Sequence, residues 1–307
     1  MADRRRINGP ASGTQPAVFE NKSQVLAKPQ RLRMPNELRR IFLQTGLVPA
    51  AAGSAYLELE AGNANRSFIP TNSTIKLSCT IQGPKPLPRN AHFSPNLQVT
   101  SSIKFMPFAA RQRRGYIRDN VERDLGSHLE NTLGGVILTD KYPKSALEIA
   151  VVVLEGEEDC LWNEELGQEY GINGIGLMNV LSASINVAVA ALINAKIECL
   201  DILSAGVAAR DGDDVLLDPC PSEHQDLTAA CAVGYLPNRD ELVGVWSRSV
   251  IASGSHDRSN DLTDSAVKAA RGAHKILMEV IKESLEREAV SETSVKAKPT
   301  NHVGMKT

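Results

Sequence analysis

The sequence predicts an α+β fold in one domain, in which mixed sheets pack against helices. Three observations lead to this class: some segments alternate apolar and polar residues, others repeat apolar residues every three or four positions, and the two kinds follow one another along the chain. With 307 residues, 42% of them hydrophobic, the chain can bury a large core. It contains no uninterrupted run of about 18 apolar residues, which argues against a membrane span.

The first half of the chain contains three predicted strands. Alternation begins at residues 56–60 and is clearest at 75–81, where every second residue is apolar. Residues 97–105 show the same alternation after the turn-rich segment 83–88. We expect these three segments to form an antiparallel sheet.

Helices and strands are interspersed in the middle of the chain. Apolar residues at helical spacing predict an amphipathic helix over 121–137, and the continuous apolar run 147–154 predicts a strand in a central position. Residues 182–196 are almost wholly apolar or small and predict a buried helix. The glycine cluster before it, 171–176, lacks the residue order and the preceding strand of a nucleotide-binding motif, and we interpret it as a flexible loop.

Four strands and a long helix complete the predicted domain. The strands are expected at 202–209, 215–217, 229–236 and 241–249. The helix begins near one of three cap candidates, Asn260, Asp261 or Thr263, and carries an apolar stripe up to Ile281. We expect it to end near Glu288, because Ser, Thr, Lys and Pro become frequent after that residue.

Charge is unevenly distributed along the chain. The formal net charge is only −2, but residues 1–40 hold nine Lys or Arg against three acids, and residues 155–176 hold seven acids and no Lys or Arg. We expect residues 1–30 to form a basic extended arm, 31–288 the domain with 155–176 as an acidic insertion, and 289–307 a disordered polar tail. The arm either contacts RNA or protein or is a solvated tail. The insertion is either a solvated loop or a docking surface for a basic partner.

The cysteines show no metal-binding or disulfide pattern. Five occur, at positions 79, 160, 199, 220 and 231, without CxxC spacing or paired histidines close by, and no HExxH motif is present. We therefore expect reduced, mostly buried thiols, no disulfide, no metal site and no cofactor.

Residues 104–118 form the strongest candidate for RNA contact. Five cations and no acid are interleaved with three aromatic residues there, just after a predicted strand. Such a loop can hold phosphates by its charge and stack bases on its rings. An equally weighted alternative is a solvated turn whose Phe residues belong to the core. We select Arg111, Arg113 and Arg114 as the expected RNA contacts.

Short motifs follow one another in a specific order. They are Arg5-Arg6-Ile7-Asn8-Gly9-Pro10, Gly53-Ser54-Ala55-Tyr56-Leu57-Glu58, Pro107-Phe108-Ala109 followed by Arg111-Gln112-Arg113-Arg114, Lys141-Tyr142-Pro143-Lys144, and Leu216-Leu217-Asp218-Pro219. In this order and spacing they resemble the RNase PH family, and within it the RNase PH-like ring subunits of the eukaryotic RNA exosome. The resemblance covers nearly the whole chain, from about Arg4 to Leu285.

The resemblance carries expectations about fold and partners. It implies a single RNase PH-like domain of the ribosomal protein S5 domain 2-like class. It implies heterodimers with other RNase PH-like subunits in a hexameric ring, a cap RNA-binding subunit beside the ring, RNA in the channel and no membrane. It also implies a location in the nucleus, the nucleolus and the cytoplasm.

The resemblance also identifies where catalytic residues are expected. Active members of the family cleave the 3′ end of RNA with inorganic phosphate, and they need two carboxylates and a phosphate-binding arginine. The two acid positions are His224 and Ala230 here, and the arginine position is Leu181. Residues 131–134 lack two further cations. An aliphatic side chain cannot pair with phosphate, and neither imidazole nor a methyl group replaces a carboxylate.

We therefore expect a non-catalytic structural subunit of the exosome ring. It would support 3′–5′ RNA processing and degradation by shaping the RNA channel and binding its neighbours. The alternative is an active phosphorolytic 3′–5′ exoribonuclease, acting alone or through a site shared in a heterodimer. A third possibility is a free RNA-binding module, which a stable monomer in solution would favour.

Overall fold

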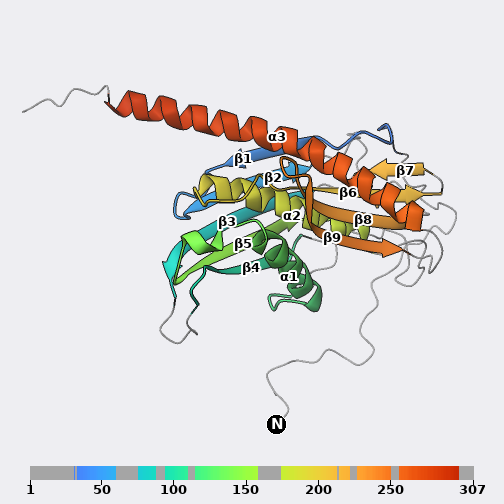
Figure 1. The fold of residues 1–307 in the computed structure, drawn as a ribbon, viewed down its shortest axis with the longest axis horizontal. Helices are drawn as coiled ribbons and strands as arrows, with labels where there is room; N and C mark the ends of the chain where they lie inside the picture. The colour runs from blue at the N-terminus through green and yellow to red at the C-terminus, as the bar shows by residue number, and fades with distance from the viewer. Residues whose placement is uncertain are drawn as a thin grey trace, which may run out of the picture.

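Two sheets and three α-helices make up the described part of the chain (Figure 1). The structure, a computed structural model, describes residue 31 and residues 33–59, 75–87, 94–109, 115–157, 174–212, 214–221, 227–249 and 256–296. The predicted α+β class, with mixed sheets packed against helices, is confirmed. The predicted basic arm, 1–30, lies outside the described residues.

The first sheet has five strands, β1 (Ile41–Thr45), β2 (Gly53–Leu59), β3 (Ile75–Pro86), β4 (Gln98–Phe105) and β5 (Ser145–Glu155). Their spatial order is β1-β2-β3-β5-β4. The alternation predicted at 75–81 is confirmed, because Ile75, Leu77, Cys79 and Ile81 are all buried. β5 lies between β3 and β4, the central position that its continuous apolar run predicts.

The direction of β4 differs from the prediction. β4 pairs in parallel with β5, with Ser101 opposite Ile149, and it has no pairing with β3. Helix α1 (Asn120–Gly134) and the short 3-10 helix η1 (Thr139–Lys141) connect the two strands. A parallel pair needs such a crossover, whereas the alternation of a strand is the same in either direction. The prediction of an antiparallel sheet is therefore wrong at β4.

β1 is a strand that the alternation did not predict. Its five residues bury Leu43 and leave Phe42 exposed, so the largest apolar side chain is on the solvent side. The Phe42 ring packs edge-on against Tyr56 of β2, with ring centroids 6.4 Å apart. A short strand with its aromatic residue outward does not show the pattern of a half-buried strand.

The second sheet is antiparallel throughout. Its strands are β6 (Ser204–Asp211), β7 (Asp214–Leu217), β8 (Leu227–Leu236) and β9 (Glu241–Ser249), in the order β7-β6-β8-β9. The four strands predicted here are confirmed. Helix α3 (His256–Lys296) packs closely on β6, because a Cβ at Gly206 would lie 2.3 Å from the backbone nitrogen of Ala270. Glycine is needed at this position to let the two backbones approach.

Helix α2 (Ile175–Asn194) lies between the two sheets and contacts strands of both. It begins at Ile175, earlier than the predicted residue 182. Gly174 precedes it with a φ of 100°, a conformation that glycine adopts without strain. The interpretation of 171–176 as a flexible loop is therefore wrong for Ile175 and Gly176, which form the first turn of the helix.

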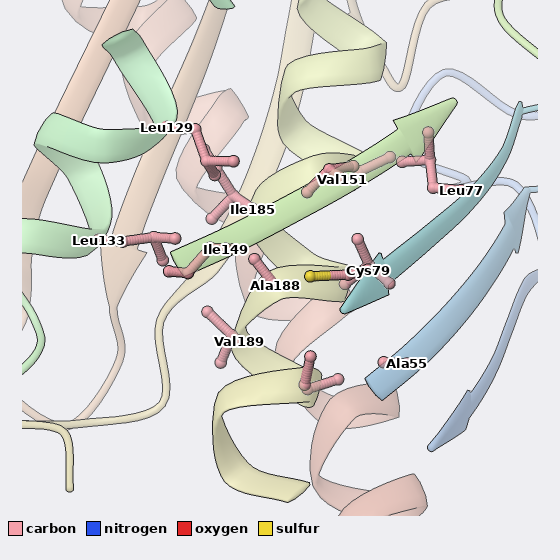
Figure 2. Packing of buried hydrophobic residues seen from close by; sticks show 14 of the residues in the cluster. Ala55, Leu77, Cys79, Leu129, Leu133, Ile149, Val151, Ile185, Ala188 and Val189 are labelled. Carbon is pink, nitrogen blue, oxygen red and sulfur yellow. The ribbon is translucent and has the colours of Figure 1, made fainter. Parts of the chain in front are cut away.

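The main core fills the space between the five-stranded sheet, α1 and α2. Figure 2 shows the packing of Leu77 and Cys79 of β3, Ile149 and Val151 of β5, Leu129 and Leu133 of α1, and Ile185, Ala188 and Val189 of α2. By length and composition α2 could cross a membrane, but 94% of that stretch is buried in the fold. Three of the described cysteines, Cys79, Cys220 and Cys231, are buried, as predicted, and Cys199 is partly exposed.

Helix α3 covers β6 and β8 and continues past β1. Its predicted apolar stripe is confirmed by the burial of Ala270, Ala273, Leu277 and Ile281. The helix runs to Lys296, and in Figure 1 it extends beyond the sheets. Residues 289–296 therefore belong to the helix and not to a disordered tail, since no Gly or Pro occurs between Glu288 and Pro299. The remainder of the predicted tail, 297–307, lies outside the described residues.

Candidate functional site

The structure describes two of the three positions at which the resemblance places lost catalytic residues. Leu181 lies in α2 and Ala230 in β8, and both side chains are buried. The other residues named from the sequence, His224, Arg111, Arg113 and Arg114, lie outside the described residues.

Ala230 is enclosed by apolar side chains. It pairs across the sheet with Ala209 of β6 and Arg248 of β9, and its side chain has no exposed surface. The first two turns of α2 pack in the same cluster through Ile175 and Met178. The cluster is completed by Val207, Ala209, Leu216, Leu227 and Ala232. The position where the resemblance places a carboxylate is thus filled by packed hydrocarbon, which offers neither charge nor a hydrogen bond.

Leu181 belongs to the main core and not to the cluster around Ala230. Its side chain is 4% exposed and packs with the buried residues of the first sheet and α1. At the end of α1, Leu133 is also in the main core, and the Thr132 hydroxyl donates to the His128 carbonyl at 2.7 Å. The positions where the resemblance places phosphate-binding cations therefore hold uncharged side chains that contribute to the fold.

Three side chains that sequence reasoning missed form a stack next to the Ala230 cluster. The rings of His128 in α1 and Trp246 in β9 are stacked, with centroids 5.1 Å apart and planes at 21°. The Arg248 guanidinium carbon lies 5.6 Å from the centroid of the Trp246 ring. Trp246 also packs against the Ala230 cluster. Trp246 and Arg248 share one face of β9 by period-two alternation, which is a signal that the sequence contains.

A second feature missed from the sequence is a buried arginine that holds two acids. Arg39 donates from Nη2 and Nε to the two carboxylate oxygens of Asp218, at 2.6 and 2.8 Å, and from Nη1 to Glu157. The Asn179 side chain of α2 donates to Glu157 and, at 2.7 Å, to the Pro219 carbonyl. We call these five residues the Arg39 network. It joins four segments: the chain before β1, the chain after β5, α2 and the chain after β7.

Opposite charges decide the protonation of the Arg39 network. Burial raises the pKa of Asp218, but the Arg39 charge, its hydrogen bonds and the Arg33 charge lower it more strongly, to about 2. Burial lowers the pKa of Arg39, yet Asp218 and Glu157 raise it well above its ordinary value. Asp218 and Arg39 are therefore both charged at neutral pH. Glu157 was predicted within the acidic insertion, but it is buried here; residues 158–173 lie outside the described residues.

No metal site is formed within the described ranges. There, no three His, Cys, Asp or Glu side chains are grouped as metal ligands would be. The acids Asp218 and Glu157 both pair with the Arg39 guanidinium, which lies between them where a metal ion would otherwise have to be.

Lys104, the first cation of the predicted RNA-contact segment, connects β4 to α1 and to the chain before it. Its ammonium group pairs with the buried Glu122 carboxylate at 2.9 Å and donates to the carbonyls of Gly115 and Ile117, both at 3.2 Å. Glu122 also accepts a hydrogen bond from the Phe105 backbone N–H at 3.0 Å. Lys104 is therefore held by contacts within the protein, and it is not one of the three arginines selected as RNA contacts.

The three aromatic residues of the segment differ in burial. Phe105 is 1% exposed and belongs to the core, which confirms the alternative interpretation for this residue. Phe108 is 72% exposed and Tyr116 is 87% exposed. Two rings of the segment are therefore available to a partner.

Comparison with known proteins agrees with the fold. The sequence profile of the RNase PH 3′ exoribonuclease family, domain 1, matches residues 37–198, more than half of the chain. A relative from Chaetomium thermophilum, the exosome complex component MTR3, is 44% identical over 292 residues, which cover 93% of this chain and 100% of the relative.

Two solved structures have the same fold. Rice Rrp46 has a TM-score of 0.61 at 18% identity, and the match covers 81% of this chain and 98% of Rrp46. A chain of the Archaeoglobus fulgidus exosome with RNA bound to the active site has a TM-score of 0.60 at 15% identity, covering 80% of this chain and 92% of that one. Because the family profile covers more than half of the chain and the Chaetomium relative matches along its whole length, this chain belongs to the RNase PH-like 3′ exoribonuclease family, in the group of MTR3 exosome components.

Proposed function

We propose that this chain is a non-catalytic structural subunit of the RNA exosome ring. The observation that carries the proposal is the burial of Leu181 and Ala230 among apolar side chains. The resemblance to the family places the phosphate-binding arginine and one catalytic acid at these two positions. Loss of a general acid or of charge stabilisation typically costs about two to four orders of magnitude in rate, and here several such groups are replaced together. The chain would then contribute shape and surface to RNA processing and degradation.

The proposed partners are other RNase PH-like subunits, in heterodimers that build a hexameric ring. The edge strands of the two sheets support a role in assembly, because β1 exposes Phe42 and β9 exposes Leu242 and Val245. Exposed apolar residues on edge strands are typical of surfaces that pair with another chain. We further propose contact with a cap RNA-binding subunit and with RNA, and a location in the nucleus, nucleolus and cytoplasm.

Native mass spectrometry of the complex that co-purifies with the full-length chain tests the assembly. The proposal predicts a ring that contains this chain and five related RNase PH-like subunits. A stable free monomer as the main species would contradict it and would favour a free RNA-binding module.

Arg111, Arg113 and Arg114 are the proposed RNA contacts of the ring subunit. Changing all three to Glu is expected to weaken RNA binding by the assembled complex about tenfold or more, because each lost phosphate contact lowers the affinity in a salt-dependent way. The measurement is protection of RNA from added nuclease, with native mass spectrometry to show that assembly is intact.

The matched control for this charge reversal lies on α3. Lys268, Lys275 and Lys282 are exposed there, and changing them to Glu alters the net charge equally at a different place. We expect normal RNA protection from this control. Unchanged protection in the Arg111, Arg113 and Arg114 variant, or equal loss in both variants, would contradict the proposed contact.

A further inference from the structure

Phe108 and Tyr116 are two exposed aromatic rings whose backbones are held in place. On the side of Phe108, the Met106 N–H donates to the Val153 carbonyl at 2.9 Å, and the Ala109 N–H donates to the Met106 carbonyl at 2.9 Å. The Ala109 carbonyl accepts from the Gly156 N–H at 2.9 Å. The residues flanking Phe108 are therefore fixed to β5 and to the chain after it, while the Phe108 ring points to solvent.

The backbone on both sides of Tyr116 is held by Lys104. The Lys104 ammonium group donates hydrogen bonds to the carbonyls of Gly115 and Ile117. These two bonds restrict the backbone on either side of Tyr116. Glu122, which pairs with Lys104, also accepts from the Asp119 N–H at 3.1 Å and is itself fully buried in α1. Helix α1 packs on β4 (Figure 1). The contacts of Lys104 and Glu122 therefore connect the backbone around Tyr116 to the sheet.

The net charge of the segment that contains the two rings favours a negatively charged partner with flat groups. Residues 104–118 contain no acid, and the carboxylate of Glu122 is buried and neutralised by Lys104. Arg118 is exposed two residues after Tyr116, and the next residue, Asp119, is exposed as well. The excess of positive charge therefore comes from the segment as a whole, which has five cations and no acid between residues 104 and 118. Single-stranded nucleic acid combines a negatively charged backbone with bases that stack on aromatic side chains regardless of sequence. A ring that is already held on a fixed backbone loses little conformational entropy when a base stacks on it.

We propose that Phe108 and Tyr116 bind single-stranded RNA by stacking on its bases, and that Lys104 is the positioning residue that holds the Tyr116 ring in place. This inference rests on the proposed function, in which the chain contacts RNA in the exosome. It adds a sequence-independent contact to bases, which is distinct from the phosphate contacts proposed for Arg111, Arg113 and Arg114.

An abasic RNA separates base stacking from phosphate binding. In the complex assembled with the full-length chain, Phe108→Ala and Tyr116→Ala are each expected to weaken binding of an oligoadenylate of about twelve nucleotides by about tenfold. Binding of an abasic RNA of the same length and charge should change less than twofold, because it has no bases to stack. Phe108→Tyr and Tyr116→Phe should restore oligoadenylate binding.

Two variants distinguish stacking from other roles of the same surface. Ile117→Ala removes a 63% exposed apolar side chain beside Tyr116 without removing a ring, so stacking predicts no effect on either RNA. Lys104→Met keeps both aromatic residues but removes the hydrogen bonds that hold the backbone on either side of Tyr116. It should therefore weaken oligoadenylate binding more than abasic RNA binding. Equal loss of both RNAs in the Phe108 and Tyr116 variants, or no loss at all, would overturn the inference.

Protein docking is a separate outcome with its own signature. Loss of ring assembly in Phe108→Ala, Tyr116→Ala and Ile117→Ala alike would show that a neighbouring subunit covers this surface, and would overturn the stacking role. In that case the proposed ring function would hold. A second result would also overturn the stacking role and leave the proposed function intact. It is normal oligoadenylate binding by the aromatic variants together with weak binding by the Arg111, Arg113 and Arg114 variant.

Discussion

Replacing Arg39 by methionine is expected to lower the free energy of unfolding by about 3–5 kcal/mol. The substitution leaves Asp218 and Glu157 without the guanidinium that both carboxylates contact, in a place where Arg39 has no exposed side-chain surface. A buried acid without its counter-charge is far less favourable than the original pair. Urea denaturation of the full-length chain, followed by circular dichroism, measures the loss.

Arg40→Met is the matched control for this prediction. Arg40 is the next residue in the chain and its side chain is exposed, so its loss should change the free energy of unfolding by less than about 0.5 kcal/mol. A small effect of Arg39→Met, similar to that of Arg40→Met, would show that the Arg39 network does not hold the four segments together.

The Arg39 network also sets an acid limit on stability. The pKa of Asp218 is about 2 in the fold and 3.8 without these contacts. The unfolded chain therefore binds this proton more readily. The stability from Asp218 is fully present above pH 3.8 and is lost as the pH falls through 2, and it amounts to about 2 kcal/mol. In Asp218→Asn this part of the pH dependence should be missing from urea denaturation curves measured between pH 5 and pH 2.

Introducing the catalytic residues that the resemblance to the family places at these positions is expected to destabilise the chain without producing phosphorolysis. Leu181→Arg would bury a guanidinium in the main core, which should cost about 3–5 kcal/mol in the free energy of unfolding. Ala230→Asp would bury a carboxylate in the apolar cluster, where the guanidinium of its cross-strand neighbour Arg248 lies over Trp246. We expect about 2–4 kcal/mol for this change.

The combined variant His224→Asp, Ala230→Asp and Leu181→Arg should release no nucleoside diphosphate from RNA. Leu177→Arg is a suitable control on α2, because Leu177 is partly exposed four residues before Leu181 and should cost about 1 kcal/mol. Phosphorolysis by the combined variant, with its stability intact, would contradict this expectation. It would mean that the apolar packing around Ala230 and Leu181 does not prevent catalysis.

Local patterns in the sequence predicted most of the individual elements. Period-two alternation identified β3, and the helical stripe identified the buried face of α3 up to Ile281. Such patterns arise because the buried face of each element carries apolar residues, so the order of apolar and polar residues along one segment shows which face is buried. They contain no information on which strand is the neighbour, so the parallel pairing of β4 with β5 was not predictable from alternation.

The site was less predictable because its contacts join residues far apart in the chain. Arg39 and Asp218 are 179 positions apart, and nothing in the residues around either one indicates the other. Lys104 looked like one cation among five, since Glu122, which neutralises it, lies outside the basic segment. By contrast, the resemblance to the family singled out Leu181 and Ala230 from the sequence alone, and the structure adds that both side chains are packed in apolar surroundings.

The central claim, that this subunit contributes structure and no chemistry, is tested most directly by phosphate-dependent release of nucleoside diphosphates from RNA. The assay compares the purified chain, its heterodimer with a neighbouring RNase PH-like subunit, and the same heterodimer carrying His224→Ala in this chain. We expect no release by the purified chain and no change on introducing His224→Ala into the heterodimer. Clear release that His224→Ala abolishes would contradict the account, because this chain would then supply a catalytic residue.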